Sequence, residues 1–259
     1  MLEARNLRKS FGSLVATNDV SLQFGKEEGE MVFIVGPNGA GKTTLINLLT
    51  GHLDPDEGSV IVHEPDGAGG TREQDITGLE PRERVDRGLV RSFQIVQVFE
   101  EMSVRENVRI AVLANQDLQG SVFSHHDRHE GVEREVDELL VEFALEDDAE
   151  TPAEELPHGD RKLLDVAMSF GLDPSYLLLD EPTSGVGTRE KERVIETVVE
   201  VSDNQDVTTV TIEHDMDIVS QYADRLIALH QGAVYAEGDP SLLETDPDLR
   251  RVLLGVEDE

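Results

Sequence analysis

Residues 36 to 44 have the composition of a loop that binds phosphate groups. The chain reads Gly36, Pro37, Asn38, Gly39, Ala40, Gly41, Lys42, Thr43 and Thr44 here, which fits the Walker A pattern G-x-x-x-x-G-K-[ST]. The glycines let backbone amides curl around phosphate oxygens, Lys42 supplies a cation for the β- and γ-phosphates, and Thr43 offers a hydroxyl to Mg²⁺. The alternative, a glycine-rich turn that fits by chance, is rare at this composition. The loop therefore predicts binding of ATP and Mg²⁺.

Two carboxylates, Asp180 and Glu181, follow the apolar run of residues 176–179. A hydrophobic strand that ends in a carboxylate beside a phosphate-binding loop is the Walker B arrangement, so Asp180 is expected to orient Mg²⁺ through water. Glu181 is then the candidate general base, which polarises the water that attacks the γ-phosphate in line. The alternative is that these acids merely end a strand in an acidic protein. The phosphate loop upstream disfavours that alternative.

The segments around these residues have strand and helix character. Residues 31–35 form an apolar run with strand character directly before the loop, and Leu45, Ile46, Leu48 and Leu49 repeat at helical spacing after it. Further predictions are short strands at 2–7 and 19–24, a strand at 207–212, a hairpin of 225–230 with 233–236, and a short helical tail at 240–255. The strand–loop–helix order supports the interpretation of residues 36–44 as a phosphate-binding loop.

The composition excludes several kinds of chemistry. The 259 residues include no cysteine, so disulfides, thiol catalysis and zinc–thiolate sites are excluded. No apolar run approaches the roughly 18 residues that a membrane-spanning helix needs. The N-terminus carries no signal-peptide pattern, so we expect the protein to stay in the cytosol.

Acidic residues dominate the charge of the chain. Asp and Glu number 55 against 22 Lys and Arg, for a formal net charge of −33. Because the acids are spread along the chain, we interpret them as the salt-adapted surface of a protein from a halophile, on which molar salt screens the repulsion. An acidic face for a binding partner is the alternative. The same acidity disfavours nucleic acid as a ligand, since phosphate contacts need clusters of Lys and Arg.

With these motifs, the chain resembles the nucleotide-binding subunit of an ABC transporter over essentially its whole length. Phe11 sits where such proteins place an aromatic ring against adenine; a buried core phenylalanine is the alternative. Gln94, in Arg91-Ser92-Phe93-Gln94, resembles the Q-loop glutamine that touches Mg²⁺ and the attacking water and links the site to the membrane partner. His214 follows the predicted strand 207–212 and resembles the switch histidine that contacts the γ-phosphate. Elsewhere a lone histidine at a strand end would be structural.

The signature motif of the family, Leu-Ser-Gly-Gly-Gln, corresponds to residues 156–160, where only Leu156 and Gly159 match. Pro157 removes a serine hydroxyl and a backbone N–H that could contact a γ-phosphate, and Asp160 replaces a neutral glutamine. The resemblance implies that Gly159 and its neighbours face the ATP of a second subunit. Gly187 also stands where the family has an aspartate, so communication between two such sites is expected to differ from the family pattern.

The resemblance implies an α/β fold with a P-loop NTPase core, in which a mostly parallel sheet is flanked by helices. An N-terminal antiparallel β-piece and an inserted α-helical subdomain complete it. Residues 1–240 are expected to form the nucleotide-binding domain, with the insertion at 88–164 and a C-terminal tail at 241–259. Within the insertion, 132–144 is amphipathic. The polar segment 115–131 contains His125, His126 and His129, and we expect a solvated loop there rather than a metal site.

Segments 74–79, 94–108, 212–216 and 253–255 resemble the group that imports branched-chain amino acids, which includes urea-type importers. This implies a Mg-dependent ATPase in which two cassettes, identical or paralogous, sandwich two ATP molecules and drive permease subunits from the cytoplasmic face of the cell membrane. One alternative is a soluble ABC-type ATPase that acts as a regulator or assembly factor without a membrane partner. The motor of an exporter is the other alternative.

Overall fold

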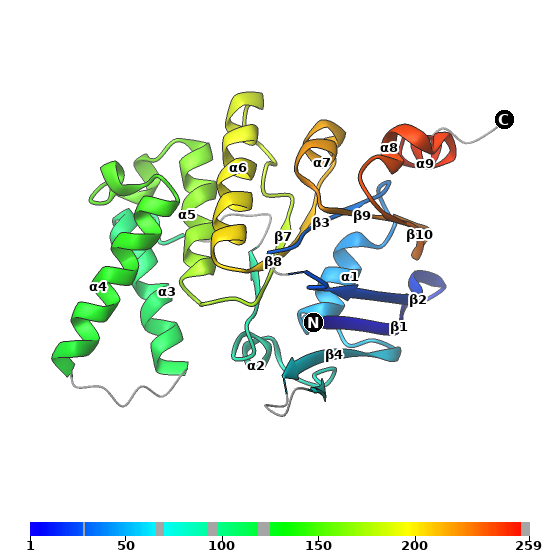
Figure 1. Cartoon of the computed structure of the whole chain (residues 1–259), viewed down its shortest axis with the longest axis horizontal. Coiled ribbons are helices and arrows are strands. Elements are labelled where there is room, and N and C mark those ends of the chain that lie inside the picture. Colours follow the sequence, from blue (N-terminus) through cyan, green and yellow to red (C-terminus); the bar gives the residue numbers. More distant parts are fainter. Residues whose placement is uncertain (28, 66–69, 93–97, 119–124, 255–259) are drawn as a thin grey trace.

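A computed structural model describes residues 1–27, 29–65, 70–92, 98–118 and 125–254 (Figure 1). The strands are β1 (Leu2–Phe11), β2 (Leu14–Phe24), β3 (Met31–Val35), β4 (Glu57–Pro65), β5 (Thr71–Asp75), β6 (Leu89–Ser92), β7 (Tyr176–Asp180), β8 (Thr208–Ile212), β9 (Arg225–His230) and β10 (Ala233–Gly238). The helices are α1 (Lys42–Leu49), α2 (Pro81–Val85), α3 (Val104–Leu118), α4 (His125–Glu142), α5 (His158–Phe170), α6 (Thr188–Asn204), α7 (Met216–Tyr222), α8 (Leu242–Thr245) and α9 (Pro247–Leu254). The expected α/β class is confirmed.

The larger sheet has six strands in the order β10-β9-β3-β8-β7-β6, and every neighbouring pair except β10 with β9 is parallel. The registers place Ile34 of β3 and Asp180 of β7 opposite the same residue of β8, Ile212. Because the strands run in parallel, their carboxyl ends meet at one edge of the sheet. The phosphate loop, the Asp180–Glu181 pair and His214 therefore leave the sheet at the same edge.

Side chains of β3 alternate between two hydrophobic cores, as the period of a strand requires. Met31, Phe33 and Val35 pack in the core that includes the buried faces of α3 to α6, whereas Val32 and Ile34 pack with α1 and with strands β1, β2 and β4. The sheet is thus covered on both faces, which explains why every residue of the central strands β3, β8 and β7 is buried.

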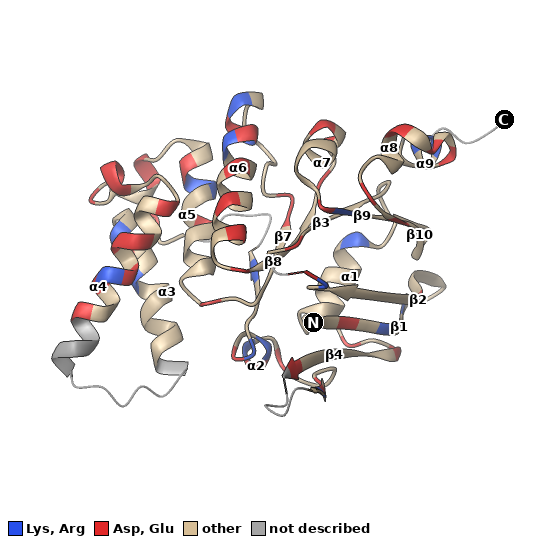
Figure 2. Cartoon of the chain, in the orientation of Figure 1, with Lys and Arg blue, Asp and Glu red and all other residues tan. Residues whose placement is uncertain are grey.

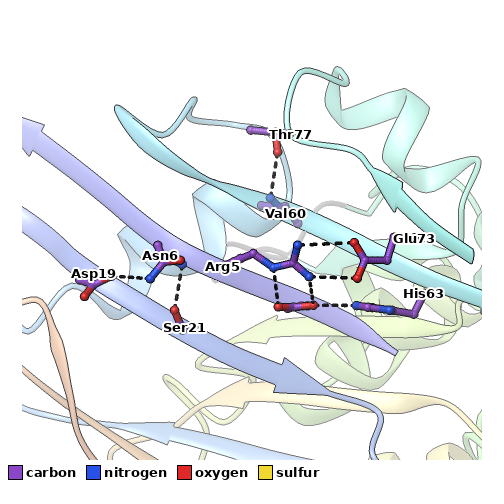
Figure 3. Close-up of polar contacts among 9 residues, drawn as sticks. Arg5, Asn6, Asp19, Ser21, Val60, His63, Glu73 and Thr77 are labelled. Carbon is purple, nitrogen blue, oxygen red and sulfur yellow. Dashed lines mark hydrogen bonds and ion pairs between the residues drawn. The ribbon is translucent and has the colours of Figure 1, made fainter.

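The smaller sheet is antiparallel, in the order β2-β1-β4-β5. On it, Arg5 donates from Nε to Glu3 Oε1 at 2.8 Å and from Nη2 to Glu73 Oε1 at 3.2 Å, and His63 Nε2 lies 2.7 Å from Glu3 Oε2 (Figure 3). The glutamate and histidine ligand atoms lie within 4.8 Å of one another, a spacing that a metal ion could bridge. The guanidinium of Arg5 already provides the positive charge there, so ion pairs account for the cluster.

Helices α3, α4 and α5 form a group beside the β6–β7 edge of the larger sheet (Figure 1). Two elements lie at the ends of the predicted insertion. Residues 89–92 form β6, which pairs with β7 at the edge of the larger sheet, and α5 continues to Phe170, beyond residue 164. The segment 115–131, predicted as a loop, is helical at 115–118 and from His125 onward. The boundaries of the domains themselves stay predictions.

Other predicted elements agree with the structure. The strand at 31–35 is confirmed without change, and the hairpin of β9 and β10 and the helical tail of α8 and α9 are confirmed with small shifts of their ends. The N-terminal strands β1 and β2 are longer than predicted, because their polar residues pair with one another across the hairpin. Of the described helices, none is both long and apolar enough to cross a membrane.

One fully buried arginine, Arg84 of α2, closes the C-terminal end of α1. Its Nη1 donates to the carbonyls of Leu48 at 2.8 Å and Leu49, and its Nη2 donates to the carbonyl of Thr77 at 2.7 Å. The last carbonyls of a helix have no partner within the helix, so this side chain satisfies groups that would otherwise be buried without hydrogen bonds.

Replacing Arg84 by alanine should lower the free energy of unfolding by roughly 3 kcal/mol, because several buried carbonyls lose their donor and a cavity is left. Arg82→Ala, on the exposed side of the same helix, is the matched control and should leave stability nearly unchanged. Denaturant unfolding of both variants measures the difference. Equal losses would contradict the capping role of Arg84.

Candidate active site

The predicted phosphate loop joins β3 to α1 and contains glycines in conformations that other residues rarely adopt. Gly36, Gly39 and Gly41 have φ of 151°, 80° and 100°. A Cβ on Gly36 would lie 2.2 Å from the carbonyl oxygen of Leu229, and one on Gly41 would lie 2.2 Å from that of Ala16. A Cβ on Gly39 would meet no atom within 4 Å. Gly36 and Gly41 are therefore required for packing of the loop against β9 and β2, while Gly39 lies open to a ligand.

Lys42 begins α1 and turns back over the loop. Its Nζ donates to the carbonyl oxygens of Gly36 at 2.6 Å and Pro37 at 3.1 Å, and the residue is only 7% exposed. Burial lowers the pKa of its ammonium group, while the carboxylates of Glu181 and Asp180 act in the opposite direction. A cation held this way lies between the loop and the two carboxylates, where it can contact phosphate oxygens.

Glu181 and His214 leave neighbouring strands and meet each other. His214 Nε2 lies 2.9 Å from Glu181 Oε1. Glu181 has φ of +52°, which is uncommon for a residue with a side chain, and its N–H donates to the carbonyl of Ile212 at 3.1 Å. The left-handed turn thus aims the carboxylate of Glu181 at the end of β8. The structure brings together two residues that the sequence predicted as catalytic.

Asp180 has a partner that sequence analysis did not identify. Arg91, on β6, donates from Nη2 to Asp180 Oδ2 at 3.1 Å and from Nη1 to Oδ1 of Asn47 on α1. Both side chains of the ion pair are 7% exposed. Arg91 therefore fixes the position of the carboxylate predicted to orient Mg²⁺ and ties it to the helix that follows the phosphate loop.

A buried carboxyl group supports the turn after Glu181. Glu213 is 3% exposed, and its Oε1 accepts hydrogen bonds from the hydroxyl of Thr183 at 2.7 Å and from the N–H of Thr183 at 3.3 Å. Burial raises the pKa of Glu213, because the charged form is poorly solvated there. The contact joins the segment that follows β7 to the segment that follows β8.

A pocket of about 260 Å³ connects these groups. The lining comprises a hydrophobic wall, the loop and two catalytic candidates: Phe11, Leu14, Ala16, Asn38, Gly39, Ala40, Gly41, Lys42, Thr43, Thr44, Glu181 and His214. Phe11 is 49% exposed, which argues against the alternative that it is a core residue. Its ring stands at the pocket wall, where a planar base could pack.

Among the described residues, the predicted site residues Gly36, Pro37, Asp180 and Gly159 are not part of this lining. Gly159 lies in the first turn of α5 and packs against α6: a Cβ there would lie 3.4 Å from Cβ of Glu190 and 3.7 Å from Nη2 of Arg193. Its predicted role toward the ATP of a second subunit stays a prediction. Gln94 lies outside the described residues.

The side chains present fit a nucleotide with Mg²⁺. The open backbone around Gly39, the ammonium of Lys42 and the aromatic ring of Phe11 match phosphate and base. Mg²⁺ prefers oxygen ligands, which the hydroxyl of Thr43 and the carboxylate of Asp180 offer. Thr43 is exposed, so its hydroxyl is accessible from the pocket that it lines.

The raised pKa of Glu213 gives a test of the turn that it supports. The unfolded chain releases this proton near the ordinary value of 4.5 and the folded chain only at higher pH, so ionisation removes stability as pH rises between the two pKa values. Relative to the Glu213→Gln variant, the wild type should be most stable at low pH and lose that advantage as pH rises above 4.5. Denaturant unfolding at several pH values measures the difference. A difference that stays constant with pH would contradict the burial effect.

Comparison with known proteins identifies the family of this chain. The ABC transporter family matches residues 17–184. The chain is 34% identical to the high-affinity branched-chain amino acid transport ATP-binding protein LivG of Escherichia coli (strain K12), with 98% of each chain covered. It is also 34% identical to a probable branched-chain amino acid transport ATP-binding protein of Archaeoglobus fulgidus, with 100% of this chain and 96% of the relative covered.

Solved structures lead to the same family. An ATP-binding cassette of an ABC transporter in its ADP conformation superimposes with a TM-score of 0.81 at 31% identity, with 98% of each chain covered. A nucleotide-free cassette superimposes with a TM-score of 0.79 at 29% identity, covering 100% of this chain and 99% of the other. The chain therefore belongs to the ABC transporter family, whose ATP-binding cassettes hydrolyse ATP to power transport.

Proposed function

We propose that this chain is the ATP-hydrolysing motor subunit of an ABC importer for branched-chain amino acids. The observation that supports it most strongly is one pocket that unites the phosphate loop with the Glu181–His214 pair. The solute is inferred from relatives named for branched-chain amino acid transport that match over nearly the full chain. The substrate of the reaction is ATP, and the products are ADP and phosphate.

We propose a role in binding for each group in and beside the pocket. Amides of the loop around Gly39 and the ammonium of Lys42 hold the β- and γ-phosphates, and Phe11 packs on the adenine ring. Thr43 and Asp180 would hold Mg²⁺, and Arg91 fixes the orientation of Asp180. When bound, Mg²⁺ neutralises charge on the phosphate oxygens. These contacts are proposed to bring the γ-phosphate to Glu181, which lines the same pocket.

Glu181 acts as the general base. Its carboxylate accepts a proton from the water that attacks the γ-phosphate in line. His214 holds Oε1 through the 2.9 Å contact, and it lines the same pocket, so it is proposed to contact the γ-phosphate as well. The left-handed backbone of Glu181 restricts where the carboxylate can point. Gln94 is proposed to contact Mg²⁺ and the same water. Phosphoryl transfer depends mainly on such positioning and on charge neutralisation.

Two cassettes, identical or paralogous, are proposed to sandwich two ATP molecules, each between one phosphate loop and the Gly159 segment of the opposite subunit. Closure of this pair would pull on permease subunits, which hold the motor at the cytoplasmic face of the cell membrane. The turn before α3 supports a docking role, because Phe99 is 48% exposed and Met102 is 39% exposed on the segment that follows Gln94 along the chain. Large apolar side chains exposed together often mark contacts between proteins.

Replacing Glu181 by glutamine should lower the rate of ATP hydrolysis at least about a hundredfold while preserving ATP binding, because the amide cannot accept the proton. The variant should also accumulate an ATP-bound dimer, since hydrolysis no longer separates the subunits. Phosphate release and size-exclusion chromatography with Mg-ATP measure the two effects. Glu57→Gln, which removes the same charge from an exposed residue of β4, is the control. Unchanged turnover in Glu181→Gln would refute the role of Glu181.

A further inference from the structure

The first turn of α5 contains an ion pair at the position where the chain departs from the family pattern. Asp160, which replaces a neutral glutamine, contacts Nη2 of Arg193 on α6. The side chain of Asp160 is 15% exposed and that of Arg193 is 47% exposed. The guanidinium of Arg193 is therefore the more accessible member of the pair, and the carboxylate of Asp160 is largely covered.

Arg193 also lies near Gly159, the matching glycine of the signature segment. The position that a Cβ of Gly159 would occupy lies 3.7 Å from Arg193 Nη2, so the guanidinium that contacts Asp160 also lies beside Gly159. The neighbouring charged groups have other contacts. Glu190 Oε2 accepts from the N–H of Gly187 at 3.2 Å, and Arg161 Nη2 donates to the carbonyl of Glu154 at 2.6 Å. Arg193 is thus the cation that the described contacts assign to Asp160.

An unpaired carboxylate at this position would repel a nucleotide. The proposed function places the first turn of α5 opposite the γ-phosphate of the other subunit, where like charges at close range oppose association. Pro157 has removed a hydroxyl and an N–H from the same segment, so fewer donors remain to offset the repulsion. A cation beside Asp160 removes this obstacle and presents N–H donors to an anion.

We propose that Arg193 is a positioning residue of the shared ATP site. It neutralises Asp160 and holds that side chain against α6, so that the altered signature segment can approach the nucleotide bound by the partner subunit. This inference rests on the proposed function, because the shared site exists only in a dimer that contains ATP. It explains how a signature segment with an acidic residue remains compatible with a polyanionic ligand.

A double-mutant cycle tests the proposal. The full chain carrying Glu181→Gln binds ATP without turnover, and its dimer dissociation constant is measured by sedimentation in Mg-ATP at a fixed KCl concentration. Arg193→Ala should weaken the dimer about tenfold, because Asp160 is left uncompensated. Adding Asp160→Asn to Arg193→Ala should restore the dissociation constant to within about twofold. Arg193→Lys, which keeps the charge, should dimerise like the parent.

The surface pair Arg251–Asp248 on α9 provides the matched control, since Arg251 Nη1 lies 3.0 Å from Asp248 Oδ1. Arg251→Ala and Asp248→Asn remove the same charges as the substitutions of Arg193 and Asp160. ATP affinity of the monomer and the melting temperature should stay unchanged in all variants. Three results would overturn the proposal: an unweakened Arg193→Ala dimer, a weakened dimer that Asp160→Asn does not rescue, or equal weakening in the Arg251 control. If the Glu181→Gln parent forms no dimer with ATP, the proposed function fails and this inference fails with it. If the parent dimerises and one of the three results above is found, only the inference about Arg193 fails.

Discussion

The net charge of −33 imposes the constraint on which the site depends, because this chain must bind a polyanion. Acidic side chains occur on helices and strands throughout the molecule (Figure 2). Long-range electrostatics therefore oppose nucleotide binding at low ionic strength. Attraction has to come from groups within a few ångströms: the backbone amides of the loop and the ammonium of Lys42, which loop carbonyls hold in place. In the same way, Arg193 is proposed to neutralise the charge of Asp160 on the signature segment, which faces the ATP of the partner subunit.

Parallel strand pairing converts this local chemistry into one pocket. Lys42, Glu181 and His214 are far apart in the sequence, but each follows a strand of the larger sheet, and the registers of β3, β7 and β8 align the ends of those strands. The left-handed turn at Glu181 then brings its carboxylate to His214. A fourth strand, β6, is connected to the site because its Arg91 donates a hydrogen bond to Asp180. A shift of any of these strands would separate Lys42, Glu181 and His214. Because the two hydrophobic cores hold the strands in register, the geometry of the site depends on the packing of both cores.

Much of this arrangement could be predicted from the sequence, because local patterns specify it. The phosphate loop has a defined glycine and lysine spacing, an apolar run precedes Asp180, and a run of valine, threonine and isoleucine with strand propensity precedes His214. The partners of these residues were missed, since ion pairs such as Arg91–Asp180 join residues far apart and leave no periodic signal. Arg84 has the sequence context of an exposed helix residue, yet the fold buries it against α1. Strand β6 was assigned to the insertion because four residues are too few to show a strand pattern.

This strongly acidic chain is proposed to hydrolyse ATP through a compact local site. The most direct test measures two quantities on the purified chain, the steady-state rate of Mg-dependent ATP hydrolysis and the affinity for ATP. Both are measured at a series of KCl concentrations from low to multimolar. Both the affinity for ATP and the rate of hydrolysis should increase with KCl concentration, because salt screens the repulsion between the acidic chain and the nucleotide. A folded chain that binds ATP but hydrolyses none at any salt concentration would contradict the ATPase assignment. Binding that weakens steadily with salt would contradict the salt-adapted surface.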